Sequence, residues 1–500
     1  MLNLLTGQQT KAADQYTIKK QAITSLELME RAAEAFVSVF TKHYTDTKTA
    51  IAIYCGTGNN GGDGLAIARL LNQEGYKNIT TKVIRFSSRL SPDFLENFDR
   101  IKASDIPVTE IKEIDPFPVE EAEVIIDALL GSGLNKPLEN AWKELVIWIR
   151  SLNRRVISVD IPTGFKSEGP IGEKDLAVKS DLTITFQRPK INFLLPESAA
   201  FIERFQVVDI KLDEVFIQSQ EGAFKLLQDK DIAEMLIKRN QFSHKGTFGH
   251  TLIIAGAQET MGAALLCSEA SLLAGSGLTT ACIPVEGLIA LNSRLPEIMA
   301  QVRVAGELPK DLQWDRYSAI AIGPGLGTST AGKTILEETL NNFNKPAVFD
   351  ADALNLLSKN PDLLSSVYEG SVLTPHVKEF DRLFGEHLTW WNRLETGLEK
   401  AKEIKCYIVL KNRYSIIFTP DGKCIFNPTG TPAMASGGMG DVLTGIIASF
   451  LSQGYSSENA AILGVFLHGK SGEDLGKPVV TASEVIHQFP KTIKSFLIQG

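Results

Sequence analysis

The run Ile51-Ala-Ile-Tyr-Cys-Gly-Thr-Gly-Asn-Asn-Gly-Gly-Asp-Gly64 decides the fold of the first half of the chain. Its apolar residues predict a short strand over Ala50–Cys55, and the glycines allow a sharp turn into a helix expected over 65–74. Backbone N–H groups at such a helix start bind anions, because the helix dipole favours negative charge there. The glycine spacing formally matches the dinucleotide pattern G-x-G-x-x-G, but that match is weak and a plain strand–helix turn is the alternative.

Two further predicted strands, Val124–Ile126 and Val156–Val159, each run into an aspartate. Asp127 opens the segment DALLGSGLNKP, and Asp160 opens DIPTG. Helical spacing after a capping box at Thr24 and over Ala141–Leu152 alternates with these strands, which predicts a parallel sheet covered on both faces. Strand ends of such a sheet meet at one edge, where ligands bind. Asp160 could instead only cap the turn that follows it.

The second half repeats the alternation of strands and helices, so the whole chain is predicted to be α/β. Strands are expected at Thr251–Ala255, Leu278–Ile283, Ala319–Ile322, Ala347–Phe349, Ser371–Leu373 and Tyr407–Leu410, and helices at Ala263–Leu273, Lys333–Asn342, Val377–Leu383 and Val442–Leu451. The pattern weakens over Leu212–Lys230, which places a boundary near residue 220. We therefore expect one domain over 1–218 and another over 225–500.

The segment Ala435-Ser-Gly-Gly-Met-Gly-Asp441 is the strongest candidate site in the second half. Gly437, Gly438 and Gly440 would present N–H groups to a phosphate. Asp441 falls in the first helical turn, where the dipole favours its charge, so it can act as a base. Its alternative role is to complete the helix start.

A competing pattern, Gly327-Thr-Ser-Thr-Ala-Gly-Lys-Thr334, matches the Walker A motif, with Asp350 as a Walker B acid. A phosphate loop begins directly where its strand ends, whereas here Gly323-Pro-Gly325 intervenes after Ile322. Lys333 also suits an ordinary helix. The Walker interpretation is therefore disfavoured.

The composition limits the function classes. The chain has 500 residues, 44% hydrophobic and 22% charged, and a net charge of -8 without a basic face, which argues against nucleic acid as the ligand. Its five cysteines are scattered in apolar runs, which indicates small buried side chains in a reducing compartment. We find no signal peptide and no apolar run of membrane length, and expect a cytoplasmic homo-oligomer that does not bind membranes.

The NNGGDG, DALLGSGLNKP and SVDIPTG segments resemble the epimerase domain of NAD(P)H-hydrate repair enzymes, which implies a Rossmann-like three-layer domain. The resemblance implies that Asp160 acts at the hydrated nicotinamide ring and that Asn60, Asp127 and Thr163 hold a potassium ion, for which oxygen ligands are suited. The implied dinucleotide-binding residues are Asn59, Asn60, Gly61, Gly62, Asp63, Gly131, Ser132, Gly133, Leu134, Asn135, Lys136 and Pro137.

The GPGLG, DADALN, LTPHVKEF and GGMGD segments resemble the ADP-dependent NAD(P)H-hydrate dehydratase, whose fold is ribokinase-like. The resemblance implies that ADP, with Mg²⁺, is bound by Lys411, Asn412, Arg413, Tyr414, Ser415 and a loop that ends at Gly440, and that Ala263, Gly327, His376 and Asp441 face the hydrate. The family often has Lys-Gly where this chain has Lys411-Asn412. His376 could equally be a structural residue at a helix start.

Together the two resemblances predict repair of hydrated NADH and NADPH. The first domain would interconvert the R and S hydrates, and the second would use ADP to dehydrate the S hydrate. One alternative is an ATP-dependent small-molecule kinase with an N-terminal nucleotide-binding module, because fold does not fix function. Another treats the first domain as a scaffold. The NNGGDG and DIPTG motifs argue against the kinase, and Asp127 with Asp160 argue against the scaffold.

Overall fold

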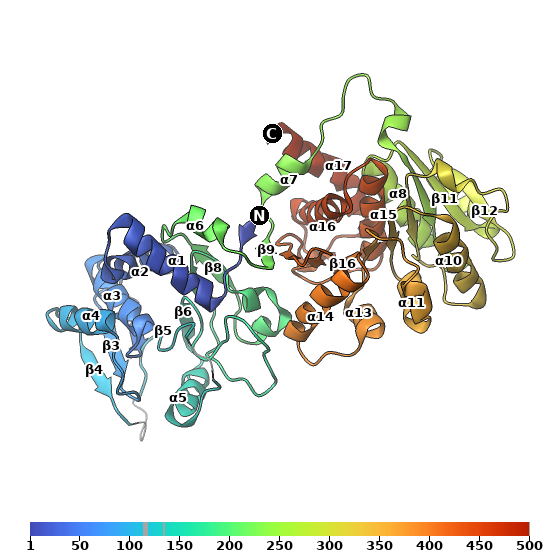
Figure 1. Cartoon of the computed structure of the whole chain (residues 1–500). Helices are drawn as coiled ribbons and strands as arrows, with labels where there is room; N and C mark the ends of the chain where they lie inside the picture. The colour runs from blue at the N-terminus through green and yellow to red at the C-terminus, as the bar shows by residue number, and fades with distance from the viewer. Residues whose placement is uncertain (114–118, 134–135, 500) are drawn as a thin grey trace. The chain divides into compact units, whose positions relative to one another are not determined.

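The computed structural model describes residues 1–113, 119–133 and 136–499, and it divides into two compact units. The N-terminal unit comprises residues 3–222 together with Thr389–Trp391. The C-terminal unit comprises Met1–Leu2 and the remainder of the chain from Ala223 onwards. Each unit is built around its own sheet (Figure 1).

The N-terminal sheet has the strand order β4-β3-β2-β5-β6-β7-β8 in the described part of the chain, and neighbouring strands pair in parallel. Its strands are β2 (Ile51–Cys55), β3 (Ile79–Ile84), β4 (Val108–Ile111), β5 (Val124–Ala128), β6 (Arg155–Val159), β7 (Leu182–Phe186) and β8 (Phe205–Val208). Its helices are α1 (Gly7–Gln21), α2 (Ser25–His43), α3 (Asn59–Gln73), α4 (Pro92–Lys102), α5 (Asn140–Ser151) and α6 (Glu214–Ser219).

Alternate residues of these strands face two separate cores, as expected for a sheet with side-chain period 2. Ile53 and Ile126 pack with α2, α3 and α4 on one face. Tyr54 and Ile125 pack with α5 on the other. The predicted parallel sheet between two helical layers is confirmed, and so is the capping box at Thr24, whose hydroxyl accepts from the N–H of Glu27.

The helix after β2 begins at Asn59, six residues before its predicted start at Leu65. Glycines normally disfavour a helix, so the sequence alone predicts a turn for this run. Here close packing requires them, because a Cβ at Gly61 would collide with the carbonyl of Gly56 and one at Gly64 with Ala128 and Cys55. The glycine-rich segment is therefore the first part of α3.

The C-terminal sheet has the strand order β1-β9-β18-β17-β16-β15-β14-β13-β10-β11-β12 among the described residues. Strands β10 to β16 pair in parallel, whereas β16, β17 and β18 form an antiparallel meander that the sequence did not predict. The strands are β1 (Leu2–Asn3), β9 (Phe224–Leu226), β10 (His250–Ile254), β11 (Leu278–Pro284), β12 (Met299–Arg303), β13 (Ala319–Ile322), β14 (Ala347–Phe349), β15 (Val372–Leu373), β16 (Tyr407–Leu410), β17 (Ile416–Phe418) and β18 (Cys424–Phe426).

Helices again cover both faces of this sheet. Those on one face include α8, α15, α16 and α17, and those on the other include α10 and α11. The helices of the unit are α7 (Asp229–Met235), α8 (Met261–Leu273), α9 (Leu288–Arg294), α10 (Thr330–Asn342), α11 (Asp352–Lys359), α12 (Pro361–Leu364), α13 (Val377–Phe384), α14 (Trp390–Glu403), α15 (Met439–Ser452), α16 (Ser457–Asp474) and α17 (Ala482–Gln499). Within the polar stretch Leu212–Lys230, where no element was predicted, the chain forms α6 and β9.

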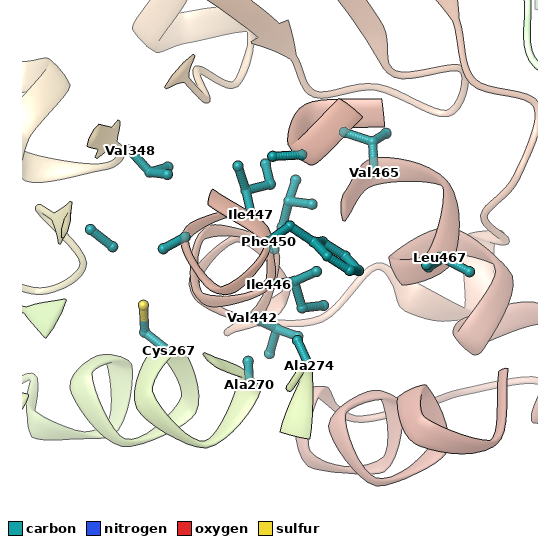
Figure 2. Close-up of a cluster of buried hydrophobic side chains, with 14 of the residues drawn as sticks. Cys267, Ala270, Ala274, Val348, Val442, Ile446, Ile447, Phe450, Val465 and Leu467 are labelled. Atoms are coloured by element: carbon teal, nitrogen blue, oxygen red, sulfur yellow. The ribbon is translucent and has the colours of Figure 1, made fainter. Parts of the chain in front are cut away.

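Helix α15 is buried along its whole length after the first turn. Figure 2 shows Val442, Ile446 and Phe450 of this helix among side chains of α8 and α16, including Cys267 and Val465. A Cβ at Gly445 would collide with the carbonyl of Cys267, so α8 and α15 approach at backbone distance. This packing fixes the start of α15, and with it Asp441, relative to the sheet.

Two other predictions concern the cysteines and the membrane. All five cysteines are free and buried, which confirms that they act as small apolar side chains. Among the described residues, every helix is too short or too polar to span a bilayer.

Candidate active sites

The end of β5 forms the centre of the N-terminal site. Asp127 is fully buried, and its Oδ2 accepts hydrogen bonds from the N–H of Thr163 and from the hydroxyl of Ser158, both at 2.9 Å. The Thr163 hydroxyl lies 2.6 Å from Asp127 Oδ1 and donates to it. Burial raises the pKa of Asp127, and these hydrogen bonds lower it. Asp127, and not Asp160, therefore caps the turn at 162–164.

Asn60, another residue predicted to bind potassium, lies against the loop that follows β5. Its side chain lies next to the backbone of Gly131, and within the described part of the chain its buried Nδ2 has no hydrogen-bond partner. This amide N–H group is a donor, so the group that would satisfy it is a hydrogen-bond acceptor and not a cation. The described residues contain no group of three His, Cys, Asp or Glu side chains that could hold a metal.

The two predicted glycine segments differ in exposure. Gly61 and Gly62 are buried against protein atoms, whereas Gly58 and Gly133 border open space. The other predicted dinucleotide-binding residues on the surface are Asn59, Ser132, Lys136 and Pro137. Leu134 and Asn135 lie outside the described residues.

Asp160, directly after β6, adopts a left-handed backbone conformation with φ of 63°. Such a conformation is strained for a residue with a side chain and clusters at functional sites. Its Oδ1 accepts hydrogen bonds from Lys190 Nζ at 2.7 Å, from the N–H of Phe186 at 3.0 Å and from the hydroxyl of Thr185 at 3.1 Å. Lys190 is buried, and sequence reasoning missed it because it lies in a segment with no recognisable motif.

Two more carboxyl groups share the electrostatic environment of Asp160. Burial, with the charge of Asp160 next, raises the pKa of Asp14 to about 6. Burial and the charges of Asp160, Asp14 and Asp93 also raise the pKa of Asp63 well above its usual value. Asp63 was predicted from its motif, whereas Asp14 was not predicted at all.

In the C-terminal unit, Asp441 lies in the first turn of α15, after the left-handed Gly438. Burial raises the pKa of Asp441 to about 6, with a further contribution from the charge of Asp350 and an opposing one from Lys411. Asp350 is buried. Its Oδ1 accepts a hydrogen bond from Lys411 Nζ and its Oδ2 one from the Thr444 hydroxyl, both at 2.7 Å. Asp350, Asp441 and Lys411 thus form a charged cluster next to the glycine loop.

His376 is the N-cap residue of α13, where its Nδ1 accepts from the N–H groups of Lys378 and Glu379. This geometry supports the structural alternative for its Nδ1. Its side chain is nevertheless 48% exposed, and its Nε2 lies 3.4 Å from Oε1 of Glu379. Of the other predicted hydrate-facing residues, Ala263 is half-buried on α8, and Gly327, with φ of 84°, donates its N–H to Asp352.

The predicted nucleotide segment 411–415 is the loop between the antiparallel strands β16 and β17. Within it, Asn412 N–H approaches the Ser415 hydroxyl at 3.4 Å, and the Arg413 guanidinium lies 4.7 Å from the ring centroid of Tyr414. A Cβ at Gly440 would lie 3.4 Å from Lys411 Nζ, so the predicted residues Lys411 and Gly440 are neighbours. Among the residues that the structure describes, no group forms a hydrogen bond with the buried Asn412 Nδ2.

The Walker-like segment forms an ordinary capped helix start. Ser329 caps α10, and Lys333 extends from that helix to Glu337 at 3.5 Å. Asp350, its supposed Walker B acid, is paired with Lys411 instead. The preference for an ordinary helix at Lys333 is supported by this geometry.

Comparisons with known proteins identify both halves. Residues 251–491 match the family model of NAD(P)H-hydrate dehydratase, and residues 25–192 match that of the YjeF-related protein N-terminus. The bifunctional NAD(P)H-hydrate repair enzyme of Thermofilum pendens is 32% identical, over 97% of this chain and 94% of its own.

A solved structure shows the fold of the C-terminal half. A ribokinase-like superfamily protein from Enterococcus faecalis is 28% identical with a TM-score of 0.50, and the match covers 55% of this chain and 98% of that one. The ADP/ATP-dependent NAD(P)H-hydrate dehydratase of Bacillus subtilis, co-crystallised with ATP and Mg²⁺, is 30% identical over 54% of this chain and 98% of its own, with a TM-score of 0.49. The chain belongs to the family of bifunctional NAD(P)H-hydrate repair enzymes.

Proposed function

We propose that residues 1–218 epimerise the R and S hydrates of NADH and NADPH, and that residues 225–500 use ADP to dehydrate the S hydrate. One observation carries this proposal. Each unit has an aspartate that lies close to a glycine-rich helix start and also close to a lysine. These are Asp160 with Lys190 and Asp441 with Lys411. The kinase alternative is not supported, because the repair-enzyme relative matches almost the whole chain, including the N-terminal unit.

In the N-terminal unit, Asp160 is the proposed catalytic group. It forms an ion pair with Lys190 at 2.7 Å, and a carboxylate can accept a proton at the hydrated ring. The N–H groups near Gly58 and Gly133 would hold the dinucleotide, because both glycines border open space. Fixing the left-handed Asp160 by three hydrogen bonds keeps the carboxylate oriented toward the substrate.

In the C-terminal unit, Asp441 is the proposed base. Its carboxylate accepts the proton of the hydrate hydroxyl as that oxygen attacks the terminal phosphoryl group of ADP. The resulting phosphate ester is a far better leaving group than hydroxide. Phosphate leaves with the bonding electrons while the neighbouring ring carbon gives up a proton to water, and the C=C bond that forms restores the reduced ring. The N–H groups of Gly437, Gly438 and Gly440 stabilise the transferring phosphoryl charge, and Lys411 neutralises part of it.

The side chains predicted to bind K⁺ supply the oxygen ligands that this cation takes. Asp127, Thr163 and Asn60 would hold K⁺ through a carboxylate, a hydroxyl and an amide oxygen. Mg²⁺ in the second unit would neutralise the phosphate charge of ADP. Dependence on K⁺, a preference for ADP over ATP, a homo-oligomeric state and a cytoplasmic location stay predictions.

The direct experiment incubates the full chain with S hydrate of NADH, ADP, Mg²⁺ and K⁺ and follows the absorbance of the reduced nicotinamide ring. We expect recovery of NADH with release of AMP and phosphate. A parallel reaction supplies ATP and a panel of alcohols. Phosphorylation of an alcohol without any recovery of NADH would establish the kinase and refute the proposal. Replacing K⁺ by Na⁺ should slow R-to-S conversion but not dehydration.

A further inference from the structure

Thr260 connects two segments that carry residues predicted to face the hydrate. It directly precedes α8, and its carbonyl oxygen accepts a hydrogen bond of 3.1 Å from the N–H of Ala263. Its hydroxyl donates a hydrogen bond of 2.6 Å to the carbonyl of Gly325, which lies two residues before Gly327. Ala263 and Gly327, which are distant in the sequence, are thus joined through Thr260.

The hydroxyl of Thr260 is not used to cap the helix that follows it. A threonine directly before a helix commonly stabilises it, because its hydroxyl accepts a hydrogen bond from an N–H of the first turn. Among the residues that the structure describes, the Thr260 hydroxyl accepts instead from the N–H of Ala257, at 3.0 Å, in the turn before α8. Its own proton is directed to Gly325. Departures of this kind from a local stability rule are typical of functional sites.

The same two segments are joined at a second point. The N–H of Gly256 donates a hydrogen bond of 2.8 Å to the carbonyl of Pro324. Arg303, buried at the end of β12, donates from Nη2 to the carbonyl of Ala255 at 2.7 Å and to that of Gly256. The first end of the turn before α8 is therefore fixed from β12, and its last end is fixed by Thr260.

The loop 323–327 depends on such external contacts for its shape. Gly323, Gly325 and Gly327 have positive φ angles of 125°, 59° and 84°. Glycine allows these conformations but also many others, so the sequence of the loop does not fix its shape by itself. A Cβ at Gly325 would lie 2.8 Å from the carbonyl oxygen of Thr260, so the two backbones are in close contact. The hydrogen bond from the Thr260 hydroxyl favours one of the conformations open to the loop.

We propose that Thr260 is a positioning residue of the dehydratase site, whose hydroxyl holds the loop 323–327 and the start of α8 in the arrangement that binds the hydrate. This inference rests on the dehydratase function proposed above and on the hydrate-facing roles of Ala263 and Gly327. Without the hydroxyl the loop samples other conformations, and the apparent affinity falls with the fraction of molecules that are competent to bind. Bound hydrate holds the loop itself, so the chemical step keeps nearly its usual rate. The proposed ADP segment 411–415 lies between other strands, and its affinity for ADP is unchanged.

The test compares Thr260→Val, Thr260→Ser and the control Thr330→Val, which changes an exposed threonine at the start of α10. Valine keeps the shape of threonine without the hydroxyl, whereas serine keeps the hydroxyl. Dehydration by the full chain is measured with the S hydrate and ADP varied in turn. We expect Thr260→Val to raise the KM for the hydrate about three- to tenfold, and to change kcat and the KM for ADP less than about twofold. Thr260→Ser and the control should stay within about twofold of the wild type.

Hydrogen exchange of the backbone amides in the loop 323–327 gives a second measurement, made without ADP so that no turnover occurs. Exchange should be faster in Thr260→Val than in the wild type, and saturating S hydrate should make the two equal. An unchanged KM for the hydrate or unchanged exchange in Thr260→Val would overturn the positioning role, and so would an equal rise in the KM for ADP or an equal loss in Thr260→Ser. A wild-type chain that returns no NADH from the S hydrate with ADP would refute the dehydratase function itself, which is a different result.

Discussion

Lys411 Nζ lies 2.7 Å from Oδ1 of Asp350, and this ion pair lies beneath the glycine loop that precedes Asp441. Asp350 and Lys411 act on the pKa of Asp441 in opposite directions. The pair therefore tunes the proposed base without being part of the loop.

The pH dependence of dehydration should follow Asp441. A base must be ionised, so kcat should fall as the pH drops below about 6. Asp350→Asn removes a negative charge that raises the pKa of Asp441, and we expect it to move this fall to lower pH. The control Asp362→Asn, on the exposed surface of α12, should not move it. An unchanged or upward-shifted profile in Asp350→Asn would show that Asp350 does not tune the base.

Asp441→Asn should stabilise the C-terminal unit while abolishing dehydration. Because the folded-state pKa is raised to about 6, the unfolded chain gives up this proton at lower pH than the folded one, so the carboxyl destabilises the fold increasingly from about pH 4 to about pH 6. The gain on replacement should approach about 3 kcal/mol near neutral pH and vanish below about pH 4. Urea unfolding of the C-terminal unit, near neutral pH and below about pH 4, measures this gain in the free energy of unfolding. A variant less stable than the wild type near neutral pH would contradict this expectation.

Lys190→Met should impair epimerisation through Asp160. The variant leaves a carboxylate without its counter-charge, at a cost of about 3 kcal/mol of stability if the carboxylate stays ionised. We expect kcat for epimerisation to fall at least about tenfold, with a smaller change in KM. Lys190→Arg, which keeps the charge, should recover part of the loss. Equal losses in the Met and Arg variants would point to packing instead of charge.

The glycines before and within α3 should differ sharply in their tolerance of a side chain. Gly61→Ala places a Cβ against the carbonyl of Gly56, which cannot move without the backbone, so we expect a loss of about 3 kcal/mol or more in the N-terminal unit. Gly58→Ala meets no atom within 4 Å and should cost under about 1 kcal/mol. Thermal unfolding of the two variants distinguishes these outcomes. Equal stability would mean that the turn is looser than its packing indicates.

The sequence predicted those parts of the sites that lie at ends of apolar strands. The apolar pattern marks the strands that lead to Asp127 and Asp160, and the glycine run marks Asp441. The structure places Asp127 and Thr163 in contact. Lys190 lies between β7 and a short 3₁₀ helix, where neither a strand nor a helix pattern marks it. Asp14 was missed because the fully buried residues of α1 are Ala13 and Thr17, which do not form a hydrophobic stripe.

The predicted bounds of helices and strands were wrong where tertiary packing overrides the local conformational preference of the residues. The helix start at Asn59 depends on contacts that glycines permit with β5 and the preceding turn, and those contacts join residues distant in sequence. The antiparallel strands β17 and β18 are three residues long each, too short for alternation to be seen.

The most direct measurement uses an equilibrium mixture of R and S hydrates with ADP, Mg²⁺ and K⁺, and compares the wild type with Asp160→Asn and Asp441→Asn. The wild type should return the whole mixture to NADH in one phase. Asp160→Asn should convert the S fraction at the wild-type rate and then leave the R fraction to its slow spontaneous epimerisation, while Asp441→Asn should return no NADH. Complete conversion by Asp160→Asn in a single fast phase, or NADH formed by Asp441→Asn, would contradict two separate aspartate sites.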